Sequence, residues 1–312
     1  MKIAVTGTTG LIGTRLVELL NDIFEITQLI LSNGVDITDK DSFAEKLKTD
    51  LPDFIVHLAA KTDVDGCETD KAEDMDKLKN EESLVGDILD FNRLNSNNWN
   101  GKASAFAINV FGTKNIAEIA AEMDIPLLYV STDFVFFGDQ EYYDEKISPK
   151  PVNWYGMTKY WGEEIVRSKN NKNIIVRLSF PYGYKSQIKK DFVWMLVGLL
   201  EKGERLSLVS DQIVTPTFID DAVLGIKFLI EKKESGIFHV TGDSFESPYD
   251  AGVLVAKSFG YDSNNFNKIS NEEYYKDRAR RPFHVRMKND KLAKLGFNTK
   301  TFQEGLRLII GA

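Results

Sequence analysis

The feature that most constrains the fold is a regular alternation of short apolar segments with helical patterns through residue 178. Apolar, β-branched runs occupy residues 3–7, 25–31, 54–60, 126–132 and 173–179, and helical patterns occupy 11–20, 116–123 and a stretch from about Tyr155. Parallel strands joined by right-handed helical crossovers produce this order. Nearly unbroken apolar strands are expected where helices cover both faces of a sheet. The sequence therefore predicts an α/β fold with a doubly wound parallel sheet.

After Arg177 the rhythm loosens into loops, helical runs and short strands. We predict a first domain of residues 1–177 plus about 213–240, in which the segment IFHV (237–240) returns to the sheet. Residues 178–212 and 241–312 are predicted to form a smaller α/β C-terminal lobe that lies over the open end of the sheet.

Residues 68–104 interrupt this pattern with a polar, acidic composition. The apolar residues in the segment recur at roughly helical spacing before an Asn-rich stretch: Met75, Leu78, Val85, Ile88 and Leu89. This spacing predicts an inserted amphipathic helix followed by a flexible connection.

The composition of the 312 residues is that of a globular protein, with 43% hydrophobic and 28% charged side chains. A net charge of −8 argues against a nucleic-acid partner. The single cysteine, Cys67, excludes an internal disulfide and a cysteine zinc site, and we predict no metal site. The chain opens directly on a buried strand, and its apolar runs are shorter than the ~20 residues of a membrane helix. We therefore expect a soluble, cytoplasmic protein without a membrane partner.

A glycine-rich turn joins the first strand to the first helix, with Gly7, Gly10 and Gly13 in the segment GTTGLIG. Small residues let the backbone turn tightly and approach a diphosphate, while free N–H groups and the helix dipole face its charge. A tight turn without a ligand is the alternative explanation. In the first strand-to-helix turn of an α/β chain, the pattern favours a dinucleotide site of the Rossmann type.

The choice between NAD and NADP stays open. An acid at the end of the second strand selects NAD, and a nearby Arg selects NADP. Here Ser32, Asn33 and Gly34 follow that strand, and they include neither an acid nor an Arg. Arg15 on the first helix is a candidate partner for the 2′-phosphate of NADP, and a solvated or packed role for it is an equal alternative.

Tyr155 and Lys159 stand four residues apart in the segment NWYGMTKYWGE (153–163). With 11 Tyr in the chain this spacing arises by chance, and a second copy occurs at Tyr142 and Lys146. Only Tyr155 and Lys159 lie on a predicted helix, capped by Asn153, where they share one face. The second copy lies in a charged stretch that Pro149 and Pro151 prevent from continuing as helix. Position therefore favours Tyr155 and Lys159 as a catalytic pair.

These residue types suit carbonyl reduction. Transfer of a hydride to a carbonyl leaves an alkoxide, so a proton donor must stand at the oxygen. A Lys ammonium beside a Tyr favours the phenolate and lowers the pKa of that hydroxyl. Ser131, Thr132 and Asp133 end a parallel strand, where open α/β sheets bind ligands. The Thr132 hydroxyl, with Ser131, is predicted to hold the carbonyl, although both residues are also suited to capping the strand end.

Together these residues resemble the extended short-chain dehydrogenase/reductase superfamily, and most closely its dTDP-4-dehydrorhamnose reductase family. The similarity spans nearly the whole chain. It lies in GTTGLIG (7–13), DITD (36–39), HLAA (57–60), STDFVF (131–136), PVNWYGMTKYWGE (151–163), VSDQIVTPTFIDDA (209–222) and RRPFHVRMKNDKL (280–292).

The resemblance implies a role for each matching residue. Tyr155 is the acid, Lys159 binds the ribose and tunes Tyr155, and Thr132 positions the carbonyl. The implied NAD(P)-binding set is Gly7, Thr9, Gly10, Leu11, Ile12, Asp36, Ile37, Leu58, Ala59, Ala60, Tyr155 and Lys159, with Asp36 and Ile37 at the adenine. The implied nucleotide-sugar contacts are Ser131, Asp133, Phe134, Tyr182 and Arg281.

The chain also departs from the family pattern. Phe134 replaces a usual Tyr, and residues 180–183 read Phe-Pro-Tyr-Gly in place of Trp-Val-Tyr-Gly. Both positions border the implied sugar site, so the identity of the sugar is open. The 68–104 insert is longer than the usual connection, and a lid, a partner surface and a solvated excursion are its three interpretations.

We predict an NAD(P)H-dependent reductase of a nucleotide-activated 4-keto-6-deoxy sugar. Related dehydratases need an acid after the catalytic Asp, and Phe134 follows Asp133 here. Two alternatives remain: a nucleotide-sugar 4-epimerase, which uses the same Tyr and Lys, and a dinucleotide-binding regulatory subunit like that of methionine adenosyltransferase. The sequence does not specify the oligomeric state, and a homodimer is one candidate.

Overall fold

The computed structural model describes residues 1–86, 88–185 and 190–311. The chain divides into two compact units. The first unit comprises Met1–Ser131, Pro151–Ile175 and Glu234–Gly236, and the second comprises Thr132–Lys150, Val176–Lys233 and Ile237–Ala312.

A six-stranded sheet forms the centre of the fold, in the order β11-β7-β6-β3-β1-β2. Its strands are β1 (Lys2–Thr6), β2 (Glu25–Leu29), β3 (Phe54–His57), β6 (Leu127–Thr132), β7 (Ile174–Leu178) and β11 (Gly236–His239). Strand β1 pairs in parallel with β2 and β3, and β3 pairs in parallel with β6. The strands lie where the apolar runs predicted them, and β11, which includes the first residues of IFHV, joins the same sheet as expected.

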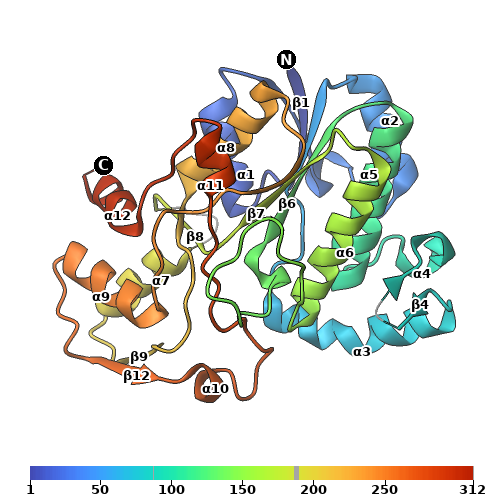
Figure 1. Cartoon of the computed structure of the whole chain (residues 1–312). Helices are drawn as coiled ribbons and strands as arrows, with labels where there is room; N and C mark the ends of the chain where they lie inside the picture. Colours follow the sequence, from blue (N-terminus) through green and yellow to red (C-terminus); the bar gives the residue numbers. More distant parts are fainter. Residues whose placement is uncertain (87, 186–189, 312) are drawn as a thin grey trace. The chain divides into compact units, whose positions relative to one another are not determined.

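The helices of the first unit are α1 (Leu11–Leu20), α2 (Lys40–Asp50), α3 (Val64–Asn80), α4 (Ser96–Trp99), α5 (Thr113–Glu122) and α6 (Trp154–Lys169), with η1 (Leu31–Asn33), η2 (Phe91–Arg93) and η3 (Ala107–Gly112). Helices α2, α5 and α6 pack side by side, and α3 contacts α6 (Figure 1). Polar side chains cap α2, α4 and α6, and Asp39 accepts hydrogen bonds from the first turn of α2. The η3 segment is a π-helix that runs directly into α5.

The predicted helix through Val85, Ile88 and Leu89 is wrong. Helix α3 ends at Asn80, and the segment continues as an antiparallel hairpin of β4 (Leu84–Val85) and β5 (Ile88–Leu89). Glu82 and Gly86 adopt left-handed backbone angles, φ 51° and 63°, which a helix does not accommodate. The stretch predicted as a flexible Asn-rich connection contains α4, and its Trp99 is completely buried.

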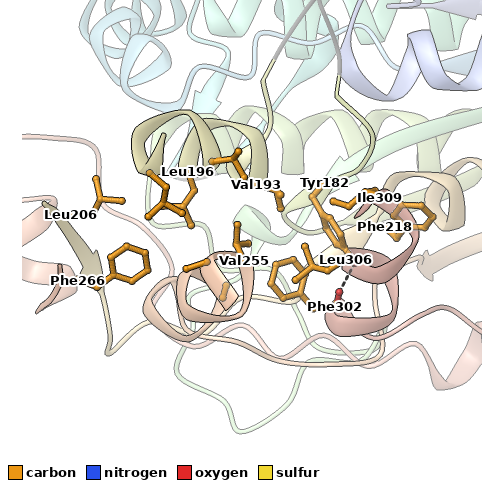
Figure 2. Packing of buried hydrophobic residues seen from close by; sticks show 14 residues of the cluster. Tyr182, Val193, Leu196, Leu206, Phe218, Val255, Phe266, Phe302, Leu306 and Ile309 are labelled. Atoms are coloured by element: carbon orange, nitrogen blue, oxygen red, sulfur yellow. Dashed lines mark hydrogen bonds between the residues drawn. The ribbon is translucent and has the colours of Figure 1, made fainter. Parts of the chain in front are cut away.

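The second unit contains β8 (Pro181–Tyr182), β9 (Leu206–Val209), β10 (Thr217–Phe218), β12 (Phe266–Ile269), η4 (Asp133–Val135), α7 (Phe192–Leu200), α8 (Ile219–Lys232), α9 (Pro248–Ser258), α10 (Asn271–Tyr274), α11 (Asp290–Lys294) and α12 (Phe302–Ile310). Strand β8 pairs with β10, and β9 pairs with β12. Apolar faces of α7, α9 and α12 meet in one core around Val193, Val255 and Phe302 (Figure 2). Residues 139–150, which hold Tyr142 and Lys146, contain no helix, as predicted.

No helix within the described ranges combines the length and apolarity needed to cross a membrane.

Candidate active site

The turn between β1 and α1 requires glycine at two positions. Gly7 has φ +73°, and a Cβ there would lie 2.5 Å from the amide nitrogen of Ala59. A Cβ at Gly13 would lie 2.2 Å from the carbonyl oxygen of Gly7. Both distances are shorter than real Cβ atoms show, so the backbone of the protein itself occupies the space that a side chain would need at each position. Gly7 and Gly13 are therefore explained by the tight turn.

Gly10 has a different reason to be small. A Cβ at Gly10 would approach Gly7 O only to 3.4 Å, so the described protein atoms leave room for a side chain. Gly10 is the N-cap of α1, where no described side chain bonds to the free N–H groups, and the first turn carries no acid. An uncapped helix start with exposed Thr9 and Gly10 suits an anion such as a diphosphate. The turn thus fits a dinucleotide.

The predicted adenine contacts sit on an ordered loop after β2. The Asp36 Oδ1 atom accepts hydrogen bonds from the backbone N–H and the hydroxyl of Thr38, both at 2.8 Å. Ile37 is buried, and its Cδ1 atom lies 2.8 Å from where Gly112 would carry a Cβ. Leu58, Ala59 and Ala60 follow β3 and are half-buried, as are Leu11 and Ile12 at the start of α1. These assignments to the cofactor stay predictions.

Tyr155 and Lys159 lie in the first two turns of α6. Asn153 caps this helix by accepting a hydrogen bond from the Gly156 N–H at 2.8 Å, as predicted. Tyr155 is 8% exposed and Lys159 is 3% exposed. The Lys159 ammonium donates to the carbonyl oxygen of Val130 in β6 at 2.8 Å, and it lies 4.0 Å from the centre of the Tyr129 ring. The end of β6 therefore holds the lysine in a defined position.

Burial dominates the electrostatics around Lys159. It lowers the pKa of Lys159 to about 7, opposed by the negative charge of Glu163 and by Cys67. Burial, reinforced by the charge of Lys159, lowers the pKa of His57 to about 3, so His57 is neutral. The His57 ring is hydrogen-bonded to Thr6 on one side and Thr113 on the other, at 2.7 and 3.0 Å. A neutral histidine avoids repulsion of the ammonium beside it.

Sequence reasoning missed Asn109, which ties α6 to the loop after β3. Its Oδ1 atom accepts from the Lys61 N–H at 2.8 Å, and its Nδ2 atom donates to Lys61 O at 3.1 Å and to the Thr158 hydroxyl at 3.0 Å. Asn109 stands in the π-helix, whose wider turn no sequence pattern announced. A lone Asn in an apolar run carries no signal of such a role.

In the second unit, Thr132, Asp133 and Ser179 form a buried hydrogen-bonded chain. The Thr132 hydroxyl donates to Asp133 at 3.0 Å and accepts from the Phe134 N–H at 3.2 Å. The Ser179 hydroxyl donates to the other Asp133 oxygen at 2.7 Å. Burial raises the pKa of Asp133 to about 6, although the bonds from Ser179 and Thr132 oppose it. Thr132 therefore caps the strand end, and its catalytic role stays a prediction.

The predicted sugar contacts have different surroundings. Tyr182 is completely buried in the core of the second unit, where its hydroxyl donates to Phe302 O at 3.2 Å (Figure 2). The Arg281 guanidinium stacks on the Tyr275 ring at 4.9 Å. Ser131, in the first unit, is buried, and its hydroxyl has no hydrogen-bond partner within the described part of the chain. Ser131 thus has capacity for one further bond.

Comparisons with known proteins show what the chain is similar to. The model of the family described as RmlD substrate binding domain matches residues 1–83 and 98–312. A dTDP-4-dehydrorhamnose reductase of Sinorhizobium fredii is 29% identical over 325 residues, covering 100% of this chain and 97% of the relative. The crystal structure of a dTDP-4-dehydrorhamnose reductase from Bacillus anthracis in complex with NADP is 28% identical with a TM-score of 0.82, covering 100% of this chain and 98% of its own.

A third relative belongs to a different functional class. Methionine adenosyltransferase 2 subunit beta of Xenopus laevis is 29% identical over 210 residues, covering 65% of this chain and 62% of the relative.

The likeness to the Bacillus anthracis structure confirms the predicted Rossmann-type α/β fold. The family match leaves out residues 84–97, which include the β4–β5 hairpin, so the unmatched part is shorter than the predicted 68–104 insert.

Proposed function

The chain belongs to the RmlD substrate binding domain family, and from this premise we propose that it reduces a nucleotide-activated 4-keto-6-deoxy sugar with NAD(P)H, as a dTDP-4-dehydrorhamnose reductase does. The observation that carries the proposal is the buried Lys159 ammonium. Lys159 lies one helical turn after Tyr155 in α6, and its ammonium is anchored to the carbonyl oxygen of Val130. Relatives with this activity match the chain along its whole length.

The first unit supplies the features that a dinucleotide needs. The uncapped start of α1 and the turn of residues 7–13 suit its diphosphate, and Asp36 and Ile37 are assigned to its adenine. When bound, the dinucleotide supplies a hydride to the carbonyl carbon. The relative from Bacillus anthracis binds NADP, and NAD remains the alternative for this chain.

The protein's own residues protonate the carbonyl oxygen and hold it by hydrogen bonds. Tyr155 donates its phenolic proton to that oxygen as the carbonyl becomes a hydroxyl, and solvent returns the proton. The charged form of Lys159 favours the phenolate that Tyr155 becomes. The Thr132 hydroxyl is assigned to bond to the carbonyl, which requires it to turn away from the Asp133 oxygen that it now faces. Asp133, Phe134, Tyr182 and Arg281 are assigned to the nucleotide sugar, with Ser131 as an additional donor.

Absorbance at 340 nm tests the proposal directly. Purified protein, NADPH or NADH and dTDP-4-keto-6-deoxy-L-mannose are combined, with Tyr155→Phe as the matched variant. We expect Tyr155→Phe to lower kcat by ~10²-fold or more while dinucleotide affinity stays nearly constant. An unchanged kcat would remove Tyr155 from the mechanism. Epimerised product without net consumption of the cofactor would indicate the 4-epimerase alternative.

The likeness to methionine adenosyltransferase 2 subunit beta favours one second candidate, a dinucleotide-binding subunit that acts through a partner protein. This candidate predicts tight dinucleotide binding with no turnover of any ketosugar nucleotide. Isothermal titration with NADPH, beside the 340 nm assay, separates the two functions.

We extend the proposal to the two domains that the sequence predicts. Residues 1–177 with about 213–240 form the NAD(P)-binding domain, and 178–212 with 241–312 form the nucleotide-sugar lobe. The proposal includes a cytoplasmic location and a homodimer as one candidate assembly, with the 68–104 insert as a lid, a partner surface or a solvated excursion. Light scattering of the purified chain measures its oligomeric state, and a monomeric mass would exclude the homodimer.

A further inference from the structure

Trp154, the residue before Tyr155, is held by two carboxylates of helix α3. Its backbone N–H, the first of α6, donates to the Glu68 carboxylate at 2.7 Å. Its indole Nε1 donates to Asp74 Oδ2 at 3.0 Å. Figure 1 shows α3 running across the end of α6 at which these bonds form. The position of the first turn of α6 therefore depends on side chains that lie about 80 residues earlier in the chain.

Asp74 also holds the segment that leads into the π-helix. The same Oδ2 atom accepts the Phe106 N–H at 3.1 Å, and Ser104 adds a further hydrogen bond. Asp74 has no exposed surface, and burial raises its pKa while the bonds from Ser104 and Trp154 oppose that rise. One buried carboxylate thus joins α3, the start of η3 and the start of α6. Its contacts connect the two helices that carry Asn109 and Tyr155.

Aromatic packing runs along the same route. The Trp154 ring packs edge-on against Trp161, with 5.4 Å between the ring centroids. The ring centroids of Trp161 and Phe106 are 5.9 Å apart, and those of Phe106 and Trp99 are 4.4 Å apart. Trp99, at the end of the insert, donates its indole N–H to Glu81 at 3.0 Å. This packing leaves Trp154 little freedom to change rotamer, so the Asp74 bond acts on a rigid side chain.

We propose that Asp74 is a positioning residue for Tyr155, because its carboxylate fixes the Trp154 indole and with it the first turn of α6. The inference rests on the proposed reductase function for its catalytic consequence. Proton transfer needs the donor within hydrogen-bond reach of the carbonyl, and small displacements of a catalytic group reduce turnover steeply. Loss of the Asp74–Trp154 bond therefore affects kcat more than the binding of the dinucleotide at the glycine turn.

The test compares Asp74→Ala, Asp74→Asn and Trp154→Phe with Asp76→Ala, a matched loss of an exposed carboxylate on the same helix. Trp154→Phe removes the indole donor and part of the ring volume but leaves the Asp74 carboxylate and an aromatic ring in place, so it covers the case in which Asp74→Ala does not fold. We expect kcat to fall by ~10-fold in Asp74→Ala and Trp154→Phe, with dinucleotide Kd within about twofold of wild type. Asp74→Asn keeps an acceptor oxygen and should restore most of kcat.

Hydrogen–deuterium exchange of the amides in the first turn of α6 provides a readout without turnover. We expect faster exchange at residues 154–157 in Asp74→Ala than in Asp76→Ala, with residues 7–13 unchanged. Equal exchange in the two variants would overturn the proposal, as would a lowered Tm with an unchanged kcat. If the wild-type protein turns over no ketosugar, the reductase function fails, and the exchange measurement alone decides whether Asp74 positions this turn.

Discussion

Replacement of Gly162 by alanine changes the free energy of unfolding in opposite directions according to helix propensity and to tertiary packing, so the sign of the change shows which effect is larger. Gly162 stands in the middle of α6, where alanine stabilises an exposed helix by about 1 kcal/mol relative to glycine. A Cβ at Gly162 would, however, lie 2.3 Å from the Tyr129 hydroxyl oxygen and 2.8 Å from Tyr129 Cζ. The same Cβ would lie 3.1 Å from the carbonyl oxygen of Asn109. Helix propensity and packing therefore predict opposite outcomes.

The geometry indicates that packing prevails. The Tyr129 ring is completely buried, with the Lys159 ammonium on its face and the His57 ring 5.4 Å away, so it has little room to withdraw. Overpacking of a filled core costs about 1–3 kcal/mol, and displacement of the hydroxyl loses a hydrogen bond of about 1 kcal/mol. After the gain in helix propensity, we expect Gly162→Ala to lower the free energy of unfolding by about 1–3 kcal/mol.

Urea unfolding followed by tryptophan fluorescence measures this change. Gly198→Ala in α7 is the control, because the nearest described atom outside its own helix would be Lys190 Nζ at 3.8 Å. There the propensity gain should appear as a small stabilisation. Tyr129→Phe removes the closest atom, so we expect it to recover part of the loss in a double variant. Stabilisation of the protein by Gly162→Ala would refute the reasoning.

Two further predictions follow from the electrostatics. Lys159→Met removes the ammonium that bonds to Val130 O, so we expect ~10²-fold lower kcat together with weaker dinucleotide binding in a fluorescence titration; loss of neither would make the residue structural. Asp133 has a folded pKa of about 6 against an ordinary 3.8, so the folded state binds more protons than the unfolded state between these values, and stability falls as pH rises through them. Asp133→Asn should remove this pH dependence of the free energy of unfolding, which amounts to at most about 3 kcal/mol at 1.36 kcal/mol per pKa unit. Identical pH slopes for the wild type and the variant in urea unfolding would contradict the raised pKa of Asp133.

Local patterns predicted the elements that carry the glycine turn and the Tyr155–Lys159 pair. The run LIGTRLVELL is helix α1 from its first residue to its last, and Asn153 caps α6 as expected. Tyr142 and Lys146, with the same spacing as Tyr155 and Lys159, lie outside any helix. Hydrophobic periodicity and capping residues act within a few positions of one another, so the chain alone carries this information.

The insert shows where such patterns fail. Its apolar residues have helical spacing, but α3 ends at Asn80, and Leu89 lies in a hairpin instead. Glu82 and Gly86 have left-handed backbone angles that a continuous helix does not accommodate, and Trp99 is buried against Phe106. A short helical period in a polar segment is therefore a weak signal when packing against the rest of the protein selects another conformation.

Local sequence thus established the α/β alternation, the glycine turn and the placement of Tyr155 and Lys159 on one helix face, because each depends on residues that are close in the chain. Tertiary structure alone decided that Val130 anchors Lys159, that Asn109 joins Thr158, and that Asp74 holds Trp154. These partners lie 29, 49 and 80 residues apart, and each pair forms only when packing brings the segments together and removes water from the polar groups.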